Sequence, residues 1–475
     1  MTSTVRSLFA VSLLSTALQG CSLNTELSVP EQALPAAFPE QSGDVTIAQI
    51  DWQHYFSDPD LLRLIDTAVA NNPDLQIALQ RIETARSSVK LANAAMLPQV
   101  NLILGGGVQK FGLYTMDGAG NASTEITPGR IVPENYTDMF LGLQSSWEID
   151  VWGKLENQRK AAAANYLASI DASNFVIANL VADVAMYYNE LLALDQQLDI
   201  VRLTIAKQQE ALEIVKLQKE TGRANELAVR QFHAQLLDTQ ALEKNLLQQI
   251  AERENNLNFL LGRYPQTITR SKSAFFGELP KEVHVGIPSQ LLVNRPDVRA
   301  AEQQIEASKF DLQAAKAAFY PNFNITAALG FQAFNAEFLF TSPASLAYSL
   351  MGTLVAPIIN MKSLEAAFNT AQANQLSAMY NYQKAILNAY VEVANQLSNI
   401  KNLQQAGELK KQQSEVLKQS VDAANELYKS ARASYLEVLL AQQSALQTSL
   451  QLIEATKQQR LATIGIYKAL GGGWK

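Results

Sequence analysis

Residue types that commonly do chemistry in proteins are few and scattered along this chain. Its histidines are His54, His233 and His284, and none stands in a His-Glu-x-x-His pair or beside a cysteine, the settings typical of zinc and hydrolytic sites. The triple glycines at 105–107 and 471–473 are not followed by Lys-Ser or Lys-Thr, so neither fits a phosphate-binding loop. The sequence therefore predicts no enzyme, no metal site and no cofactor.

Cys21 is the one cysteine of the chain, and its setting points to a covalent modification. Arg6 precedes an apolar run at 8–18 that is too short to span a bilayer as a mature helix, and the run ends in Leu-Gln-Gly-Cys. This resembles the lipobox of bacterial lipoproteins, in which the thiol is acylated. We expect residues 1–20 to be a signal peptide and Cys21 to carry lipid; the alternative is an incidental cysteine after an ordinary signal peptide.

The composition indicates a folded chain and excludes some partners. Hydrophobic residues make up 48% of the sequence and charged residues 17%, which is not the composition of a disordered protein. A net charge of −7 argues against a nucleic-acid partner, and a single cysteine excludes an intramolecular disulfide. Residues 21–59 contain Pro30, Pro35 and Pro39 and lack hydrophobic periodicity, so we expect an extended, lipidated tether there.

Long helices account for much of the rest. No proline occurs between Pro133 and Pro265, and Gly222 is the one glycine within residues 154–261. Apolar residues in this stretch step by 4 and 3, the heptad pattern of helices that pack side by side. They are Leu180, Val184, Tyr187, Leu191, Leu194, Leu198, Val201 and Ile205. Because glycine permits a tight reversal, residues 154–262 are predicted to form a helical hairpin with arms reaching roughly 100 Å.

Two stretches before the hairpin change to a period of two. Residues 136–150 alternate apolar and polar side chains, and residues 99–112 are rich in apolar residues and glycine. Both stretches are predicted to be strands, each long enough to cross a bilayer when tilted. Between them, Asp117 to Pro133 is expected to be a long exposed loop.

The second half of the chain repeats this order of elements. Asn294-Arg295-Pro296-Asp297 answers Asn71-Asn72-Pro73-Asp74, and Arg223 reappears 209 positions later as Arg432. The chain is therefore predicted to be two copies of one design. The predicted parts are a first repeat at 60–262, a connecting equatorial segment at 263–293 and a second repeat at 294–473, whose strands lie at about 321–334 and 346–357 and whose hairpin spans 362–470.

Four strands per chain have a consequence for assembly. Four strands cannot close a barrel, and an open sheet edge is not tolerated in lipid because its backbone groups would stay unpaired. The chain is therefore expected to share one barrel with copies of itself. Three copies would supply twelve strands and a ring of long helices.

The chain resembles the TolC-like outer-membrane efflux channel family, in particular its lipoprotein branch, over essentially all of the mature sequence. The resemblance rests on four segments: Ser-Trp-Glu-Ile-Asp-Val-Trp-Gly at 146–153, Arg-Pro-Asp-Val-Arg-Ala-Ala-Glu at 295–302, Phe-Tyr-Pro at 319–321 and the C-terminal Tyr-Lys-Ala-Leu-Gly-Gly-Gly-Trp at 467–474. It implies a mixed α/β membrane protein, a homotrimer with a twelve-stranded β-barrel in the outer membrane of a Gram-negative bacterium, continued by a long periplasmic α-helical barrel.

The resemblance also implies a function and partners. The trimer would be a passive conduit that exports small molecules, drugs or metal ions, from an inner-membrane pump and a periplasmic adaptor, while resting in outer-membrane lipid. Two alternatives stay open: a coiled-coil scaffold at the cell envelope, and a protein-secretion conduit of the same fold. Family likeness alone favours efflux over secretion.

A gate is implied just after the second reversal of the chain. The lipoprotein branch typically reads Tyr-Leu-x-x-Leu-Asp-Ala-Gln-Arg where this chain has residues 435–443, so Leu440 and Gln443 stand in place of the charged pair. Leu436, Leu440 and Gln443 share one helical face, and three copies would form leucine rings that close the pore by excluding water. The alternative is that Leu440 is an ordinary coiled-coil packing residue.

The two helical reversals, Lys219 to Ala224 and Ser430 to Ser434, are predicted to contact the adaptor because they are the ends of long rods. Gly222, Arg223 and Arg432 are the residues expected to make this contact. The alternative is that the two arginines are merely solvated.

Overall fold

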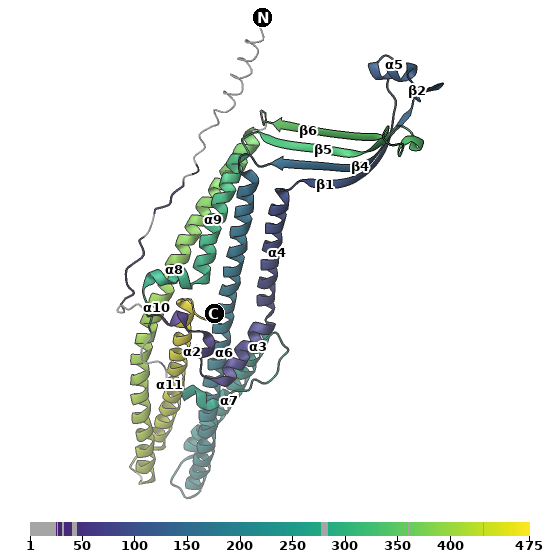
Figure 1. Ribbon diagram of the computed structural model, residues 1–475. Coiled ribbons are helices and arrows are strands. Elements are labelled where there is room, and N and C mark those ends of the chain that lie inside the picture. The colour runs from purple at the N-terminus through teal and green to yellow at the C-terminus, as the bar shows by residue number, and fades with distance from the viewer. Residues whose placement is uncertain are drawn as a thin grey trace. The chain divides into compact units, whose positions relative to one another are not determined.

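The computed structural model describes residues 25, 27–30, 33–39, 45–276, 284–359, 361–430 and 432–475, so Cys21 lies outside the described residues. The chain divides into two compact units (Figure 1). The strand unit contains Thr84–Tyr166 and Gln303–Met379. The hairpin unit contains Pro30–Glu83, Leu167–Glu302 and Tyr380–Lys475.

The elements of the described residues follow the order expected from the repeat. Those of the first half are η1 (Ile47–Gln49), α2 (Trp52–Tyr55), α3 (Pro59–Asn71), α4 (Pro73–Ala95), β1 (Gln99–Gln109), α5 (Met116–Ser123), β2 (Glu125–Thr127), β3 (Arg130–Ile131), β4 (Tyr136–Ile149), α6 (Lys154–Glu220) and α7 (Glu226–Leu260). Those of the second half are η2 (Lys272–Phe276), η3 (Pro288–Gln290), α8 (Leu291–Asn294), α9 (Pro296–Ala317), β5 (Asn322–Ala333), η4 (Ala336–Phe338), β6 (Leu346–Val355), α10 (Met361–Lys429) and α11 (Tyr435–Ala469).

An antiparallel sheet of order β1-β4-β5-β6 forms the strand unit's main feature. Each repeat contributes one pair of antiparallel strands, β1 with β4 and β5 with β6, and the two pairs join through β4 and β5. The register places side chains of one kind in rows across the sheet, as in the row Leu102, Leu143, Leu329 and Tyr348. Successive side chains of a strand point to opposite faces, so this row belongs to one apolar face.

The segment predicted as a long exposed loop contains regular structure, which corrects that expectation. Helix α5 and the short hairpin β2–β3 lie within it. The helix begins because the Thr115 hydroxyl accepts a hydrogen bond from the Gly118 N–H at 3.1 Å. Small residues allow this fold, since a side chain at Gly118 would collide with the Gly112 carbonyl.

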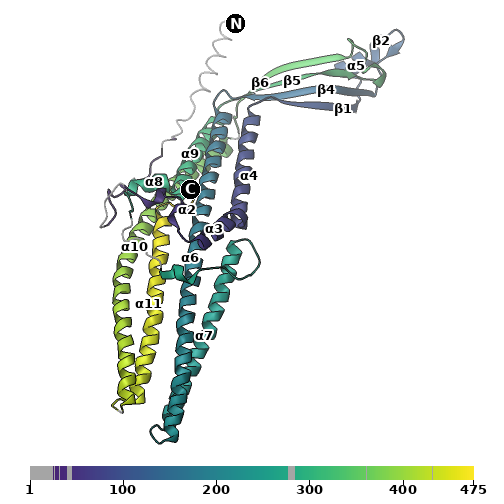
Figure 2. The same ribbon diagram turned by 60° about the horizontal axis from the view of Figure 1, so that its bottom comes forward.

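The hairpin unit is built on α6, which lies beside α7, while α10 lies beside α11 (Figures 1 and 2). The predicted heptad positions of α6 form its core: Leu180, Val184, Leu191, Leu194, Leu198 and Val201 are all at most 8% exposed. Residues of α3, α7 and α11 pack around them. The 4,3 spacing therefore identified the seam of this unit correctly.

The tether predicted for residues 21–59 does not extend to its end. Phe38 is buried, 3% exposed, and stacks on Tyr390 with ring centroids 5.5 Å apart. The Gln383 amide also donates a hydrogen bond to the Pro30 carbonyl. An isolated aromatic residue between prolines has no periodicity to reveal that it packs into a core formed by distant residues.

The connecting segment is fastened to the first hairpin by charge. The Arg270 guanidinium pairs with Asp195 at 2.6 Å and with Glu254 at 2.6 Å, and Lys272 pairs with Asp199 at 2.8 Å. Arg270 and Asp195 are nearly buried, with side chains 10% and 8% exposed. This segment therefore holds α6 and α7 together from one side.

Candidate functional site

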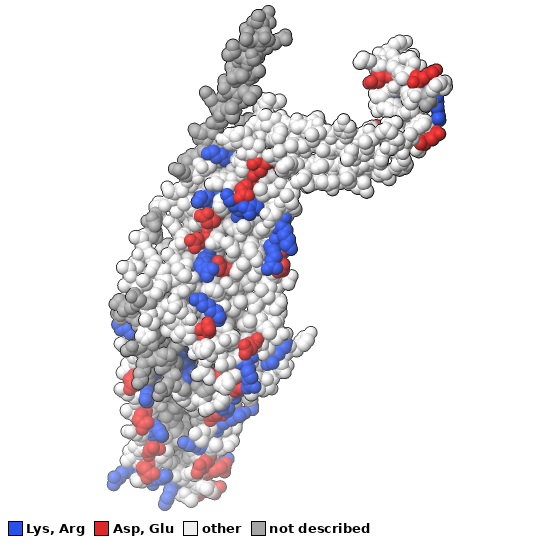
Figure 3. All heavy atoms as spheres, in the orientation of Figure 1, with Lys and Arg blue, Asp and Glu red and all other residues white. Residues whose placement is uncertain are grey.

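The sheet of the strand unit exposes a continuous apolar face. On β1, Val100, Leu102 and Leu104 are 59%, 74% and 77% exposed, and Tyr348 and Leu350 on β6 are 81% and 77% exposed. The visible surface of the strands is almost free of charge over most of its length (Figure 3). An apolar surface of this extent is typical of contact with lipid or another protein.

Most polar side chains of the strands lie on the other face. The register pairs Asn101 with Gln144, and Gln144 with Ala328, in a row that alternates with the apolar one. The carboxylates of Asp138 and Glu148 also belong to this face of β4. Asp138 accepts a hydrogen bond from Gln332, and Glu148 pairs with Lys154 at 2.5 Å.

The sheet also has two open edges. Within the described residues, β1 pairs with β4 alone and β6 pairs with β5 alone. An unpaired strand edge beside an exposed apolar face is a site for strand addition, since its N–H and C=O groups lack partners.

Both reversals of the hairpin unit end their helices in the same way. The Arg223 N–H bonds the Gln218 carbonyl at 2.8 Å, and the Arg432 N–H bonds the Leu427 carbonyl at 2.8 Å. In the first reversal Gly222 has φ of +74°, which completes a Schellman-type cap. The repeat thus extends to the hydrogen bonds of the turns.

The predicted adaptor residues are accessible. Gly222, Arg223 and Arg432 are all exposed. Beside them, Glu226 pairs with Lys219 at 2.5 Å and with Arg230 at 2.7 Å. The hydrogen bond from Lys219 is the main cause that holds the pKa of Glu226 below its ordinary value.

The predicted gate residues share one exposed stripe of α11. Leu436 and Leu440 are 49% and 54% exposed, and Gln443 is exposed. Tyr435 and Leu439 face the other way and pack against the apolar cluster of α6 and α7. Within one chain, therefore, Leu440 is not a packing residue of the hairpin seam, while its position in an assembled pore stays a prediction.

One contact that the sequence did not reveal joins the two hairpins. The Tyr428 hydroxyl of α10 donates a hydrogen bond to the Gln218 side-chain oxygen of α6 at 2.6 Å. Both residues lie within a few positions of the reversals. Neither residue type nor spacing distinguishes them, because the partners are far apart in sequence and belong to different repeats.

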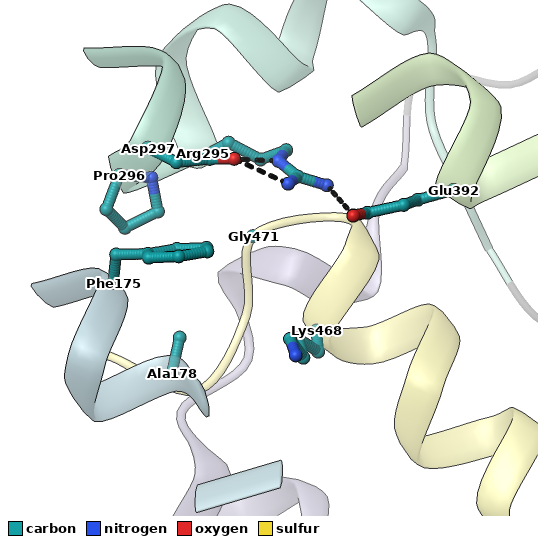
Figure 4. Close-up of a pocket in the computed structure, with 8 residues that line it drawn as sticks. All are labelled: Phe175, Ala178, Arg295, Pro296, Asp297, Glu392, Lys468 and Gly471. Carbon is teal, nitrogen blue, oxygen red and sulfur yellow. Dashed lines mark hydrogen bonds and ion pairs between the residues drawn. The ribbon is translucent and has the colours of Figure 1, made fainter. Parts of the chain in front are cut away.

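The Arg295-Pro296-Asp297 segment has a packing role. The Arg295 guanidinium is nearly buried and pairs with Asp297 at 2.6 Å and with Glu392 at 2.6 Å (Figure 4). Burial disfavours its charge, but these hydrogen bonds outweigh burial and raise the pKa of Arg295. The adjoining cavity, lined also by Phe175 and Lys468, has a volume of about 50 Å³. It is far smaller than ligand pockets of about 300–1,000 Å³.

Two further findings concern the described residues as a whole. No group of three or more His, Cys, Asp or Glu side chains in the described part of the chain could hold a metal ion. Among the described helices, α6 alone is long and apolar enough to pass as a membrane span, and 44% of its most apolar window is buried. Burial of this kind fits the central helix of a core.

Comparison with known proteins agrees with this arrangement. The family described as outer membrane efflux protein matches residues 64–263 and 287–472. The chain is 31% identical to cation efflux system protein CusC of Escherichia coli K12, with 96% of this chain and 97% of that protein aligned. It is 30% identical to probable outer membrane lipoprotein SilC of Salmonella typhimurium, with 96% of each aligned.

The fold is also shared. A crystal structure of CusC superposes with a TM-score of 0.80 at 27% identity, covering 95% of this chain and 100% of that one. The resemblance inferred from the sequence is thereby confirmed, together with the fold of outer-membrane efflux channels at the level of one chain. The chain therefore belongs to the outer membrane efflux protein family and is an outer-membrane transport protein, not an enzyme.

Proposed function

We propose that three copies of this chain form a single channel, in which the edge of β6 in one copy pairs with the edge of β1 in the next. The observation that supports this is the four-stranded sheet with an exposed apolar face and two open edges. Twelve strands would close the barrel and pair every edge, as a bilayer requires. The apolar face would meet lipid and the face of Asn101 and Gln144 would line the pore.

The cargo we propose is small molecules, drugs or metal ions, delivered by an inner-membrane pump through a periplasmic adaptor. The likeness to CusC, a cation efflux protein by name, supports metal ions as one class. The channel itself would be passive. Lipid on Cys21 would add membrane affinity without being needed for insertion, because a single acylated end binds reversibly whereas a closed barrel spans the membrane.

Membrane insertion tests the barrel. The variant Cys21→Ser, exported with a cleavable signal, should form trimers that stay in the outer-membrane pellet and conduct ions in planar bilayers. Wild-type trimers, which keep Cys21, serve as the control in the same membranes. Soluble monomers without conductance would refute the shared barrel.

The gate proposal rests on the exposed stripe of Leu436, Leu440 and Gln443. Two leucine rings one helical turn apart would exclude water from the pore. Leu440→Asp should wet the constriction and raise single-channel conductance with little loss of trimer. Gln447→Asp, an exposed position two turns along the same helix, is the control and should leave conductance nearly unchanged. A trimer that dissociates without any gain in conductance would place Leu440 at a subunit contact.

The adaptor proposal concerns Arg223 and Arg432. Replacing both with glutamate should weaken crosslinking to the adaptor while trimers persist, because a cation at each exposed reversal is reversed in sign. The control replaces Lys207 and Lys411 with glutamate. These are exposed lysines of α6 and α10 that lie away from the reversals. Unchanged crosslinking in the arginine variant, with full export activity, would show that these arginines are only solvated.

A further inference from the structure

The second hairpin contains a close helix contact that the first hairpin lacks. In α10, Gly407 lies so near to Gln459 of α11 that a β-carbon on it would come within 2.4 Å of the Gln459 amide nitrogen. That amide donates a hydrogen bond to the Leu403 carbonyl at 2.7 Å. The absence of a side chain at Gly407 is what lets the Gln459 amide reach the backbone of α10.

The equivalent positions of the first hairpin hold an apolar pair. Leu198 lies 209 residues before Gly407, and Ile250 lies 209 residues before Gln459. Leu198 is 5% exposed and packs in the same apolar cluster as Ile250. The same place in the two repeats is thus a packed seam in one and a glycine with an inserted amide in the other.

The inserted amide competes with the helix itself. In a regular α-helix the Leu403 carbonyl accepts the N–H of the residue four positions later, which is Gly407. The Gln459 side chain therefore shares an acceptor with the backbone bond of that turn. Glycine inside a helix and a side chain inserted into its hydrogen-bond ladder are two recognised causes of helix bending, and here they coincide.

Packing differs on the two sides of this turn. Toward the start of α10, Ala389 and Val393 are fully buried, in a cluster with Ile466 of α11. Among the described residues of α10 after Val393, none is buried. A second glycine contact, Gln396 of α10 against Gly465 of α11, lies between the packed part and Gly407.

From this geometry we propose that the Gly407 turn is the pivot at which α10 bends when the channel opens. Bending here would move the reversal at residues 430–434 and the adjoining stripe of Leu436 and Leu440 together, while the packed part around Val393 stays in place. This inference rests on the proposed gate, since it names the element that moves that gate.

The test replaces Gly407 by alanine in the full-length trimer. The clash is with the flexible end of Gln459, so the chain can fold, but the amide is displaced from the Leu403 carbonyl. Alanine also favours the helix over glycine, so hydrogen exchange of the amides at 403–411 should slow about five-fold. Asn402→Ala is the matched control: it is exposed, raises helix propensity nearby and does not touch the contact with Gln459.

Conductance separates the pivot from the gate. In a Leu440→Asp background, Gly407→Ala should reduce the frequency of fully open events about five-fold, and Asn402→Ala should not. If Leu440→Asp alone conducts like wild type, the gate assignment is wrong, and the pivot then stands only if Gly407→Ala reduces opening of the otherwise wild-type channel more than Asn402→Ala does. If Gly407→Ala changes exchange at 403–411 no more than Asn402→Ala does, the pivot is refuted whatever the gate does.

Discussion

The two helical hairpins descend from one pattern in the sequence, yet they are held together differently. The first, α6 with α7, has a buried seam that continues toward its reversal through Val201, Leu212 and Val215, each at most 5% exposed. In the second, the described part of α10 beyond Val393 has no buried residue. A repeat can therefore preserve helix length and turn geometry while changing how strongly each copy packs.

Ion pairs join the two helices of the first hairpin. Across the first hairpin, Arg202 pairs with Glu243 at 2.9 Å, Arg253 pairs with Glu190 at 2.8 Å, and Arg270 binds both helices. Across the second hairpin, the Lys410 ammonium group donates a hydrogen bond to the Gln451 side-chain oxygen at 2.8 Å. The bond from the Lys410 ammonium group has one ionised partner, whereas each ion pair of the first hairpin has two.

Helix α11 is the link between them. Its Leu446 and Leu450 pack against the apolar cluster of α6 and α7, and Tyr435 and Leu439 pack against the cluster nearer the first reversal. The second hairpin is thus held mainly through one of its two helices. Removing an ion pair or an apolar packing contact should therefore change the stability of the two hairpins by different amounts.

The largest effect is expected from Arg270→Met, which removes the cation that joins Asp195 and Glu254. Two nearly buried carboxylates would lose their partner, so the local opening free energy of α7, measured by hydrogen exchange, should fall by about 3–5 kcal/mol. The control is Lys272→Met, whose exposed pair with Asp199 should cost at most about 1 kcal/mol. Equal effects of the two variants would mean that the connecting segment does not hold the first hairpin.

A second comparison uses one residue type at equivalent places. Leu194 is 8% exposed in the first hairpin, and Leu403, 209 residues later, is half-buried in the second. Leu194→Ala should lower the opening free energy of α6 by about 2–5 kcal/mol, and Leu403→Ala should lower that of α10 by about half as much. Hydrogen exchange on each helix measures both. Matching losses would show that assembly buries Leu403 as deeply as Leu194.

Much of this fold could be predicted from the sequence because its helices and strands follow the periodicity of apolar residues. The 4,3 spacing from Leu180 to Val201 located a seam that is buried, and the alternation at 136–150 corresponds to β4. Chain reversal at Gly222 followed from the conformational freedom of glycine. Such signals are local, so they can be read along a single chain.

Contacts between residues far apart in the sequence could not be predicted. Phe38 gave no sign of its stacking on Tyr390, and Gly407 is visible as a glycine but its partner Gln459 is not. Nor could the sequence indicate that the Tyr428 hydroxyl meets Gln218 of the other repeat. These pairs depend on how the two hairpins pack, which no spacing along one helix encodes.

Loss of the hydrogen bond from Tyr428 to Gln218 should have a smaller effect than the two changes above. Tyr428→Phe removes the bond with little change of side-chain volume. Conformations in which the two helical reversals lie apart should therefore become more favourable by about 1 kcal/mol, or roughly five-fold in population. Spin labels at Thr221 and Ser430 in a Cys21→Ser background would report this as a broader distance distribution. Gln218→Ala should add nothing further in the double variant. Additive effects of the two substitutions would show that the bond does not form.

The smallest effect should come from the ion pair across the first reversal. The pKa of Glu226 is held below its ordinary value of 4.5, chiefly by the hydrogen bond from Lys219 and then by that from Arg230. A carboxyl group with a lowered pKa stabilises the folded turn above its ordinary pKa, and this stabilisation is lost as the pH falls through the lowered value. The backbone mobility of the first reversal should therefore stay constant from pH 7 down to about pH 4.5 and increase only below that.

A nitroxide at Thr221 would measure this loss as a gain in mobility on acidification. Glu226→Gln is the reference: it should be more mobile than wild type at pH 7, and the two should converge in acid, where wild type also lacks the charge. The second reversal has Tyr428 and Tyr435 at the positions of Lys219 and Glu226, so it lacks this particular pair. If the Glu226→Gln reference matched wild type at pH 7, the ion pair would contribute nothing to the turn, and the two reversals would differ in composition only.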